Sequence, residues 1–236
     1  MTYMLDSYFK SPTLKGFASI PAREVVTPSG TIIRGRFPSV TAHRMVAFEQ
    51  LLERDALYLF EFCPFIKDIH EQPFRLNYAF ANKTRRYTPD YALTLLNGSR
   101  VIIEVKPTRS LLKQDIKAKF ETIHAAMERQ QHHFMILTER EIRQEPRLAN
   151  FKRLHPFLQT PYSLESRRIF KNIQSQLHQH GSLTLEACTR HYKDEYGVLH
   201  LLAHGMLHCD LTQPIGPESV LSMKNEEVDH VLIDWL

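Results

Sequence analysis

The sequence predicts an α/β protein with a mixed β-sheet, followed by a small winged-helix-like C-terminal module. Two apolar runs, 91–96 and 101–105, flank an Asn-Gly pair, which is the pattern of a β-hairpin. A helical period over 113–129 precedes a short apolar run at 134–137. This strand, helix, strand order places a crossover helix over a sheet. After Pro161, three short helical patterns follow.

Composition excludes several classes of protein. At 236 residues the chain can form one large domain or two modest ones. No apolar run reaches the length of a membrane span, and the N-terminus lacks the apolar segment of a secretory signal, so we expect a cytoplasmic protein without a membrane partner. Cys63, Cys188 and Cys209 are scattered, which suits reduced thiols. The net charge of +4 is compatible with a polyanionic partner.

Residues 1–40 are expected to form a basic, irregular arm, because prolines and glycine interrupt any regular period. Arg34 and Arg36 are candidate DNA-binding residues within it. Such an arm can lie along DNA phosphates or pack on its own domain, and both alternatives stay open.

A helical period predicts a helix over 41–57, with Thr41 as its N-cap. Glu49 follows Phe48 at the edge of the apolar stripe, from where a carboxylate could reach a metal site. The alternative is a solvated helix glutamate. Glu53 is expected to be solvated.

Residues 58–80 are expected to be strand material, since the last part alternates apolar and polar residues. A basic cluster, Lys83, Arg85 and Arg86, follows on an expected loop. These cations are candidate DNA-binding residues that could guide a phosphate backbone, or they are simply solvated.

The hairpin carries the residues with the clearest chemistry. Asp90 precedes its first strand, and Glu104 and Lys106 share one face at the end of the second, because side chains alternate along a strand. Carboxylate oxygens hold hard divalent cations such as magnesium. A lysine can orient an attacking water or neutralise charge that grows on a phosphate.

The length of the hairpin loop decides whether Asp90 joins this face. A two-residue loop would pair Asp90 with Val105 and turn the aspartate away. A three-residue loop at 96–98 pairs Asp90 with Glu104, and requires Gly98 in the left-handed conformation. We predict the three-residue loop or an equivalent bulge.

The second half of the chain is expected to be mostly helical. Residues 139–155 should form a helix that ends before Pro156, and a linker should separate a first domain, 41–157, from a second domain over 162–236. That domain should contain three helices, closed by Gly205, and two short strands at 206–211 and 219–223. It could contact DNA or protein through its third helix and wing, or only stabilise the first domain.

Histidines and a cysteine near the third helix do not favour a zinc site. His200 and His204 are one helical turn apart, but Gly205 should end the helix before His208, and no CxxC pair accompanies Cys209.

The motif Pro89-Asp90 with Glu104-Val105-Lys106 fits the PD-(D/E)xK pattern of metal-dependent nucleases. The longer context is more specific, and consists of Gly35-Arg36 before Phe37-Pro38-Ser39, Val46-Ala47-Phe48-Glu49 before Leu52-Glu53, and Gln72-Pro73 before Tyr87-Thr88-Pro89-Asp90. Together these segments resemble the TnsA family, the endonuclease subunit of heteromeric transposases. The short length and basic arm are most similar to TnsA of CRISPR-associated transposons.

This resemblance implies a restriction-endonuclease-like fold and an enzyme that nicks the 5′ ends of a transposon in double-stranded DNA. The partner TnsB cuts and joins the 3′ ends, and the AAA+ regulator TnsC is a further partner. Such a protein would associate with the nucleoid when active. A stand-alone restriction or repair nuclease and a non-catalytic adaptor of the transposase assembly remain alternatives.

The resemblance also implies roles for individual residues. The family's helix acid corresponds to Glu49, its metal aspartate to Asp90, its strand acid to Glu104 and its lysine to Lys106. Magnesium or manganese would be held by Asp90, Glu104 and the Val105 carbonyl, and by Glu49 directly or through water, while Lys106 positions the attacking water. Phe48 and Gln50 depart from the commoner Trp and Ser around the helix acid.

Overall fold

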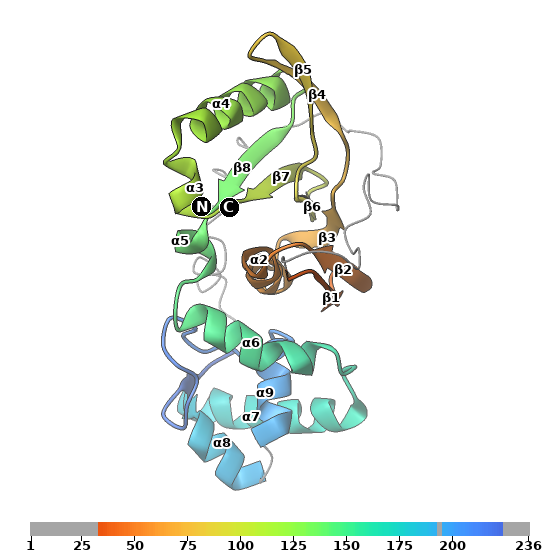
Figure 1. Ribbon diagram of the computed structural model, residues 1–236. Helices are drawn as coiled ribbons and strands as arrows, with labels where there is room; N and C mark the ends of the chain where they lie inside the picture. The colour runs from red at the N-terminus through yellow and green to blue at the C-terminus, as the bar shows by residue number, and fades with distance from the viewer. Residues whose placement is uncertain (1–32, 193–194, 224–236) are drawn as a thin grey trace. The chain divides into compact units, whose positions relative to one another are not determined.

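The computed structural model describes residues 33–192 and 195–223, and the predicted N-terminal arm lies almost wholly outside the described residues (Figure 1). The chain divides into two compact units, Met1–Ile142 and Arg143–Leu236. This division falls earlier than the linker expected around Pro156. In the described parts of the chain, no helix combines the length and the apolar character needed to span a bilayer.

The first unit is built on a four-stranded mixed sheet, as the sequence predicts. Its strands are β3 (Ile66–Glu71), β6 (Tyr91–Leu95), β7 (Arg100–Val105) and β8 (His133–Leu137), in the order β3-β6-β7-β8. The first two pairings are antiparallel, and β7 and β8 are parallel. Helix α4 (Gln114–Arg129) is the crossover between the parallel strands. This arrangement is compatible with the restriction-endonuclease-like fold that the resemblance implies.

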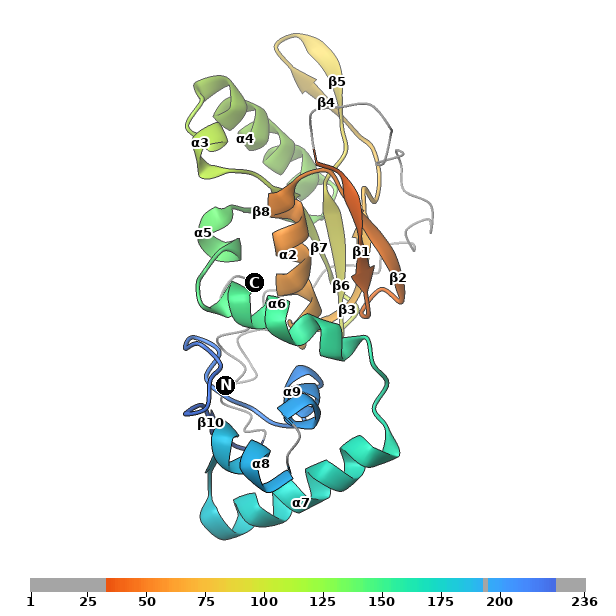
Figure 2. The same cartoon turned by 60° about the horizontal axis from the view of Figure 1, so that its bottom comes forward.

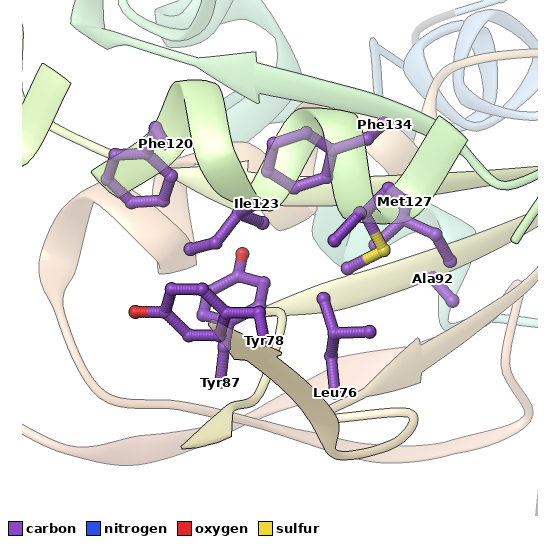
Figure 3. Packing of buried hydrophobic residues seen from close by; sticks show 10 residues of the cluster. Leu76, Tyr78, Tyr87, Ala92, Phe120, Ile123, Met127 and Phe134 are labelled. Atoms are coloured by element: carbon purple, nitrogen blue, oxygen red, sulfur yellow. The ribbon is translucent and has the colours of Figure 1, made fainter. Parts of the chain in front are cut away.

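Helices cover both faces of this sheet. Phe60 of α2 (Leu51–Glu61) packs edge-on against Tyr91, while Ala92, the next residue of the same strand, joins the cluster under α4. Because neighbouring residues of a strand point to opposite faces, α2 and α4 lie on opposite sides. Figure 3 shows the α4 side, where Phe120, Ile123 and Met127 pack against the sheet. Two short helices, α3 (Thr108–Leu111) and α5 (Glu139–Ile142), complete the unit.

Residues 35–48 form an antiparallel hairpin, so the prediction of a helix starting at Thr41 is wrong. Its strands are β1 (Gly35–Ser39) and β2 (Arg44–Phe48), and helix α2 begins only after Gln50. Apolar residues at this spacing also fit a strand, and the buried Val46 and Phe48 alternate with more exposed neighbours.

Two contacts hold this hairpin in place. A Cβ atom on Gly35 would lie 2.6 Å from the ring of Phe48, so only glycine allows the two strands to approach here. Glu61, at the far end of α2, accepts hydrogen bonds from the backbone N–H groups of Val40 at 3.0 Å and Thr41 at 3.2 Å. Residues 58–61, expected in a strand, therefore end a helix that anchors the hairpin turn.

A second hairpin carries the basic cluster. Its strands are β4 (Leu76–Phe80) and β5 (Lys83–Tyr87), joined by a two-residue turn in which Ala81 and Asn82 have φ of 51° and 57°. Lys83, Arg85 and Arg86 thus lie on a strand and not on the expected loop. Figure 1 shows this ribbon reaching beyond the central sheet, beside α4.

The β6–β7 hairpin has the three-residue loop that the sequence predicts. The N–H of Leu95 donates to the carbonyl of Ser99 at 2.9 Å, and Gly98 has φ of 83°. Tyr91 pairs with Ile103, so the same register places Asp90 opposite Glu104.

The second unit starts with α6 (Arg147–Leu158), which continues through Pro156 instead of ending before it. Buried Phe151 and Leu154 fix this helix, and packing therefore outweighs the hydrogen bond that proline removes. The three predicted helices are present as α7 (Leu164–His180), α8 (Leu185–Tyr192) and α9 (Glu195–Ala203). Figure 2 shows α7, α8 and α9 from a second direction.

The predicted C-terminal hairpin is only partly present. Strand β10 (Val220–Leu221) pairs with β9 (Leu183–Thr184), which precedes α8. The expected pairing with 206–211 is reduced to one bridge between His208 and Ser222. The small sheet therefore joins the connection between α7 and α8 to the segment that follows α9.

Substitution of Gly98 tests the hairpin loop. Nothing lies within 4 Å of the position of an added Cβ, so Gly98→Ala costs only backbone strain, about 1 kcal/mol of unfolding free energy in a urea titration. Gly98→Asn should cost less, because asparagine tolerates the left-handed conformation. Equal stability of the alanine variant and the native protein would contradict the assigned loop.

Candidate active site

Asp90, Glu104 and Lys106 come together at one end of the β6–β7 hairpin. The Nζ of Lys106 lies 3.0 Å from Oε1 of Glu104. The N–H of Val105 donates to Oδ2 of Asp90 at 2.7 Å. Glu104 is 3% exposed, and its register places it on the same face as Ile102, under α4. The convergence predicted from the loop length is therefore present.

Tyr87 fixes the orientation of Glu104. Its hydroxyl donates to Oε2 of Glu104 at 2.6 Å, so both carboxylate oxygens of Glu104 have a named partner. The Tyr87 ring is buried, with the rings of Phe120 and Phe134 packed edge-on against it. Burial raises the pKa of Tyr87, and the charge of Glu104 raises it further, so the phenol stays protonated and remains a donor.

The backbone of Asp90 is held from β3. The N–H of Gln72 donates to the carbonyl of Asp90 at 2.8 Å. Gln72 adopts a φ of 45°, which is uncommon for a residue other than glycine, and Pro73 follows it. The Gln72-Pro73 motif thus ends β3 in a turn that positions the strand carrying the aspartate.

Glu53 joins this site, although the sequence predicted a solvated side chain. It is 6% exposed and accepts the N–H of Glu49 at 2.6 Å through Oε2. Burial raises its pKa to about 7, and the charges of Glu49 and Glu104 add to the rise. Glu53 is the third residue of α2, a position from which a glutamate reaches back over the helix start. A prediction that started the helix at Leu51 could have identified Glu53 as a residue of the site.

Glu49 does not lie on a helix. It occupies the bend between β2 and α2, with its side chain 21% exposed and Oε1 3.9 Å from the Nε of Arg34. Arg34, a predicted DNA-binding residue, therefore lies beside an acid at the edge of the site. The prediction that Glu49 lies on a helix is wrong. Glu49 is nevertheless close to the carboxylate cluster, because its charge raises the pKa of Glu53.

The cluster contains more acidic than basic side chains. Desolvation raises the pKa of Asp90 well above its usual range, and the carboxylates of Glu104 and Glu53 raise it further. Burial disfavours the charged form of Lys106, but Glu104 and Asp90 outweigh this effect and raise its pKa. Repelling carboxylates with one nearby lysine form a site that gains from an added cation.

The donor set fits magnesium that keeps part of its water. No group of three or more His, Cys, Asp or Glu side chains in the described residues is arranged to hold a metal ion by itself. Magnesium is commonly bound through one or two carboxylates together with waters and substrate phosphates. Asp90, Glu104 and the Val105 carbonyl are the groups that would hold it, with Glu53 or Glu49 acting through water.

Four of the five predicted DNA-binding residues occupy exposed positions of two strands, and the fifth, Arg34, is half-buried just before β1. Arg36 is exposed on β1, and Lys83, Arg85 and Arg86 are exposed on β5. The alternation of β5 places Lys83 and Arg85 on the face of Tyr87, and Arg86 on the opposite face. The cluster that appears continuous in the sequence is thus divided between two faces.

The histidines of the second unit have a structural role. The Nε2 atoms of His200 and His204 both lie 3.1 Å from the carbonyl of Thr160. Within the residues described, no zinc-like cluster includes them. The three cysteines are buried and form no disulfide, in agreement with the expected reduced thiols.

A family model described as TnsA-like endonuclease N terminal matches residues 63–139. The matched segment contains Asp90, Glu104 and Lys106, and begins after the helix that carries Glu53. It confirms the resemblance drawn from the sequence. No curated protein gives a significant match to the chain.

The raised pKa of Glu53 predicts a pH-dependent stability of the metal-free protein. The folded state holds the proton of the Glu53 carboxyl more tightly than the unfolded state does. This proton therefore adds to the unfolding free energy at low pH, and its contribution is lost as pH rises from about 4.5 to about 7. The native protein should therefore lose roughly 3 kcal/mol of unfolding free energy through Glu53 between pH 4.5 and pH 8, and Glu53→Gln should lack this loss. The measurement is a denaturant titration in the presence of a chelator.

The exposed Glu121 on α4 supplies the matched control for this measurement. Glu121→Gln should follow the native pH profile. If Glu53→Gln followed it as well, the assignment of Glu53 to the repelling cluster would be wrong.

Proposed function

We propose, from the TnsA-like endonuclease domain that the chain contains, that the protein is the metal-dependent DNA endonuclease subunit of a transposase. It would cleave the 5′, non-transferred strands at transposon ends, together with a TnsB-type transposase and a TnsC-type regulator. The ion pair of Glu104 and Lys106 beside Asp90, inside the matched segment, is the observation that carries this proposal.

The protonation states of the site residues define what each can do. Lys106 has a raised pKa, so it serves as a fixed positive donor to the water or the scissile phosphate and not as the base. Tyr87 keeps Glu104 in one orientation through Oε2. A bound magnesium or manganese ion would supply charge neutralisation at the phosphate and a more acidic water.

We assign the helix acid of the site to Glu53 in place of Glu49. Glu53 is buried and interacts electrostatically with Glu104 and Lys106, whereas the Glu49 side chain is near Arg34 and partly exposed. Glu49 contributes its backbone N–H, which orients the Glu53 carboxylate. The two glutamates therefore have different roles in the same turn.

DNA contact is proposed for the predicted cations of the first unit, which are the half-buried Arg34 and the exposed Arg36, Lys83, Arg85 and Arg86. Their contacts would be with phosphates, which position a duplex without reading its sequence. None of these five side chains is buried, so each is accessible to a DNA duplex.

The second unit is proposed to be winged-helix-like. Its support is the element order, in which β9 lies between α7 and α8, and β10 follows α9 and pairs back to β9. Residues 197–203 of α9 are all buried, so this third helix has little surface with which to read a DNA groove.

The loop in the place of a wing is also occupied by contacts within the unit. Asn150 of α6 donates to the carbonyls of Leu211 and Gln213 at 2.9 and 2.8 Å, and Arg153 donates to that of Ile215 at 2.6 Å. These contacts favour a structural or protein-binding role for the second unit over DNA reading.

Cleavage of transposon-end DNA, with and without the partner transposase, tests the proposed function. Asp90→Ala should lower magnesium-dependent 5′ cleavage more than about a hundredfold, the factor expected from losing roughly 3 kcal/mol of transition-state stabilisation. Asp90→Asn keeps an oxygen for the Val105 N–H and should be equally inactive while folded. Native cutting by Asp90→Ala would end the proposal, and strong cutting of naked DNA by the protein alone would favour a stand-alone nuclease.

The two helix-start glutamates are distinguished in the same assay. Glu53→Gln should lower the cleavage rate more than about tenfold, since a charge that faces the site is lost. Glu49→Gln keeps the backbone N–H and should change the rate less than about threefold. The reverse order of effects would restore Glu49 as the helix acid.

A further inference from the structure

Lys119 lies next to the candidate active site but is not used by it. It projects from α4, and its Nζ lies 5.2 Å from the ring centroid of Phe120 and 5.8 Å from that of Tyr87. The Nζ of Lys106 lies 5.9 Å from the same Phe120 ring. One aromatic ring therefore has the active-site lysine and a second lysine around it.

The two lysines differ in their acidic partners. Lys106 pairs with Glu104, but in the described part of the chain no carboxylate pairs with Lys119, whose side chain is half-buried. Asp115, one turn earlier on α4, is exposed and makes no ion pair with it. A lysine that rests on aromatic faces keeps its three N–H donors available to an outside anion.

A third cation extends this line along the β4–β5 ribbon. The guanidinium carbon of Arg85 lies 5.6 Å from the ring centroid of Phe80. Arg85 pairs across the ribbon with Tyr78, and Tyr87 pairs with Leu76, so Arg85 and Tyr87 share the face that packs under α4. Figure 3 shows Tyr78, Tyr87 and Phe120 on this side. We name Lys106, Lys119 and Arg85 the basic strip.

The rings beneath the basic strip are unsuited to stacking on bases. Phe120 and Tyr87 are 4% and 6% exposed, so their faces are covered by the protein. The rings hold cations in place, and the ligand that the cations fit is a chain of phosphates and not an unstacked base.

We propose that the basic strip binds the phosphate backbone flanking the scissile phosphate, with Lys119 contacting a neighbouring phosphate. This inference rests on the proposed function and adds a residue that the sequence did not single out. Lys119 is not a catalytic residue, because its partners are rings and not the carboxylate cluster.

The test measures how the affinity of the full chain for duplex DNA depends on salt concentration. Binding is measured by fluorescence anisotropy in the absence of divalent metal. Lys119→Met keeps packing against the rings but loses the charge, and should lower the slope of log affinity against log salt by about 0.9, one phosphate contact. Its affinity loss between 50 and 200 mM salt should then be about threefold smaller than that of the native protein. Lys119→Arg should restore the slope.

Lys117→Met is the matched control, because Lys117 is exposed on the same helix and has no ring contact among the described residues. Its slope should equal that of the native protein. Equal slopes for Lys119→Met and Lys117→Met, or no binding of duplex by the native chain, would overturn the proposal.

Cleavage assays separate this inference from the proposed function. If the native protein binds with the expected slopes but cuts no DNA with magnesium and its partners, the nuclease proposal fails while the basic strip stands. Lys119→Met should raise the DNA concentration that gives a half-maximal cleavage rate, whereas Lys117→Met should leave this concentration at its native value. Equal concentrations for the two variants would contradict the assignment of Lys119 as a phosphate contact.

Discussion

The gathering of acidic side chains at one end of a strand pair is the constraint on which the first unit depends. Glu53 and Glu104 are buried and Asp90 is partly buried, and among the described residues Lys106 is the cation that offsets their charge from inside the cluster. Such a cluster costs stability unless protons, hydrogen bonds or a cation offset the repulsion. The backbone N–H groups of Val105 and Glu49 and the hydroxyl of Tyr87 supply the hydrogen bonds. The repulsion that remains between the carboxylates is what a divalent cation would offset.

Backbone geometry imposes this cluster. A loop of three residues, with Gly98 in the left-handed conformation, sets the register that brings Asp90 opposite Glu104. The turn at Gln72 then fixes the carbonyl of Asp90. A shift of one residue in either place would turn a carboxylate to the other face of the sheet, because side chains alternate along a strand. The chemistry therefore depends on two turns more than on any single contact.

The accuracy of the sequence interpretation follows from the range of the interactions involved. The loop at Gly98 and the helix over Gln114–Arg129 were predictable, since turn geometry and apolar period are local. The start of α2 was not, because apolar residues before it fit a helix and a strand equally well. Glu49, expected on that helix, therefore lies in the bend before it. Burial of α9 also could not be read from the sequence, because it depends on packing against α6, far away in the chain.

The positions of the cations suggest a division of work within the first unit. Lys106 is paired with carboxylates, so its positive charge acts mainly inside the site and attracts distant phosphates only weakly. Lys119 and Arg85 rest on rings, which orient a cation without neutralising it. An acidic site repels DNA unless nearby positive charge offsets it. Cations that rest on aromatic faces supply this positive charge. Among the described residues they form no ion pair with the carboxylates, so neither charge is neutralised by the other.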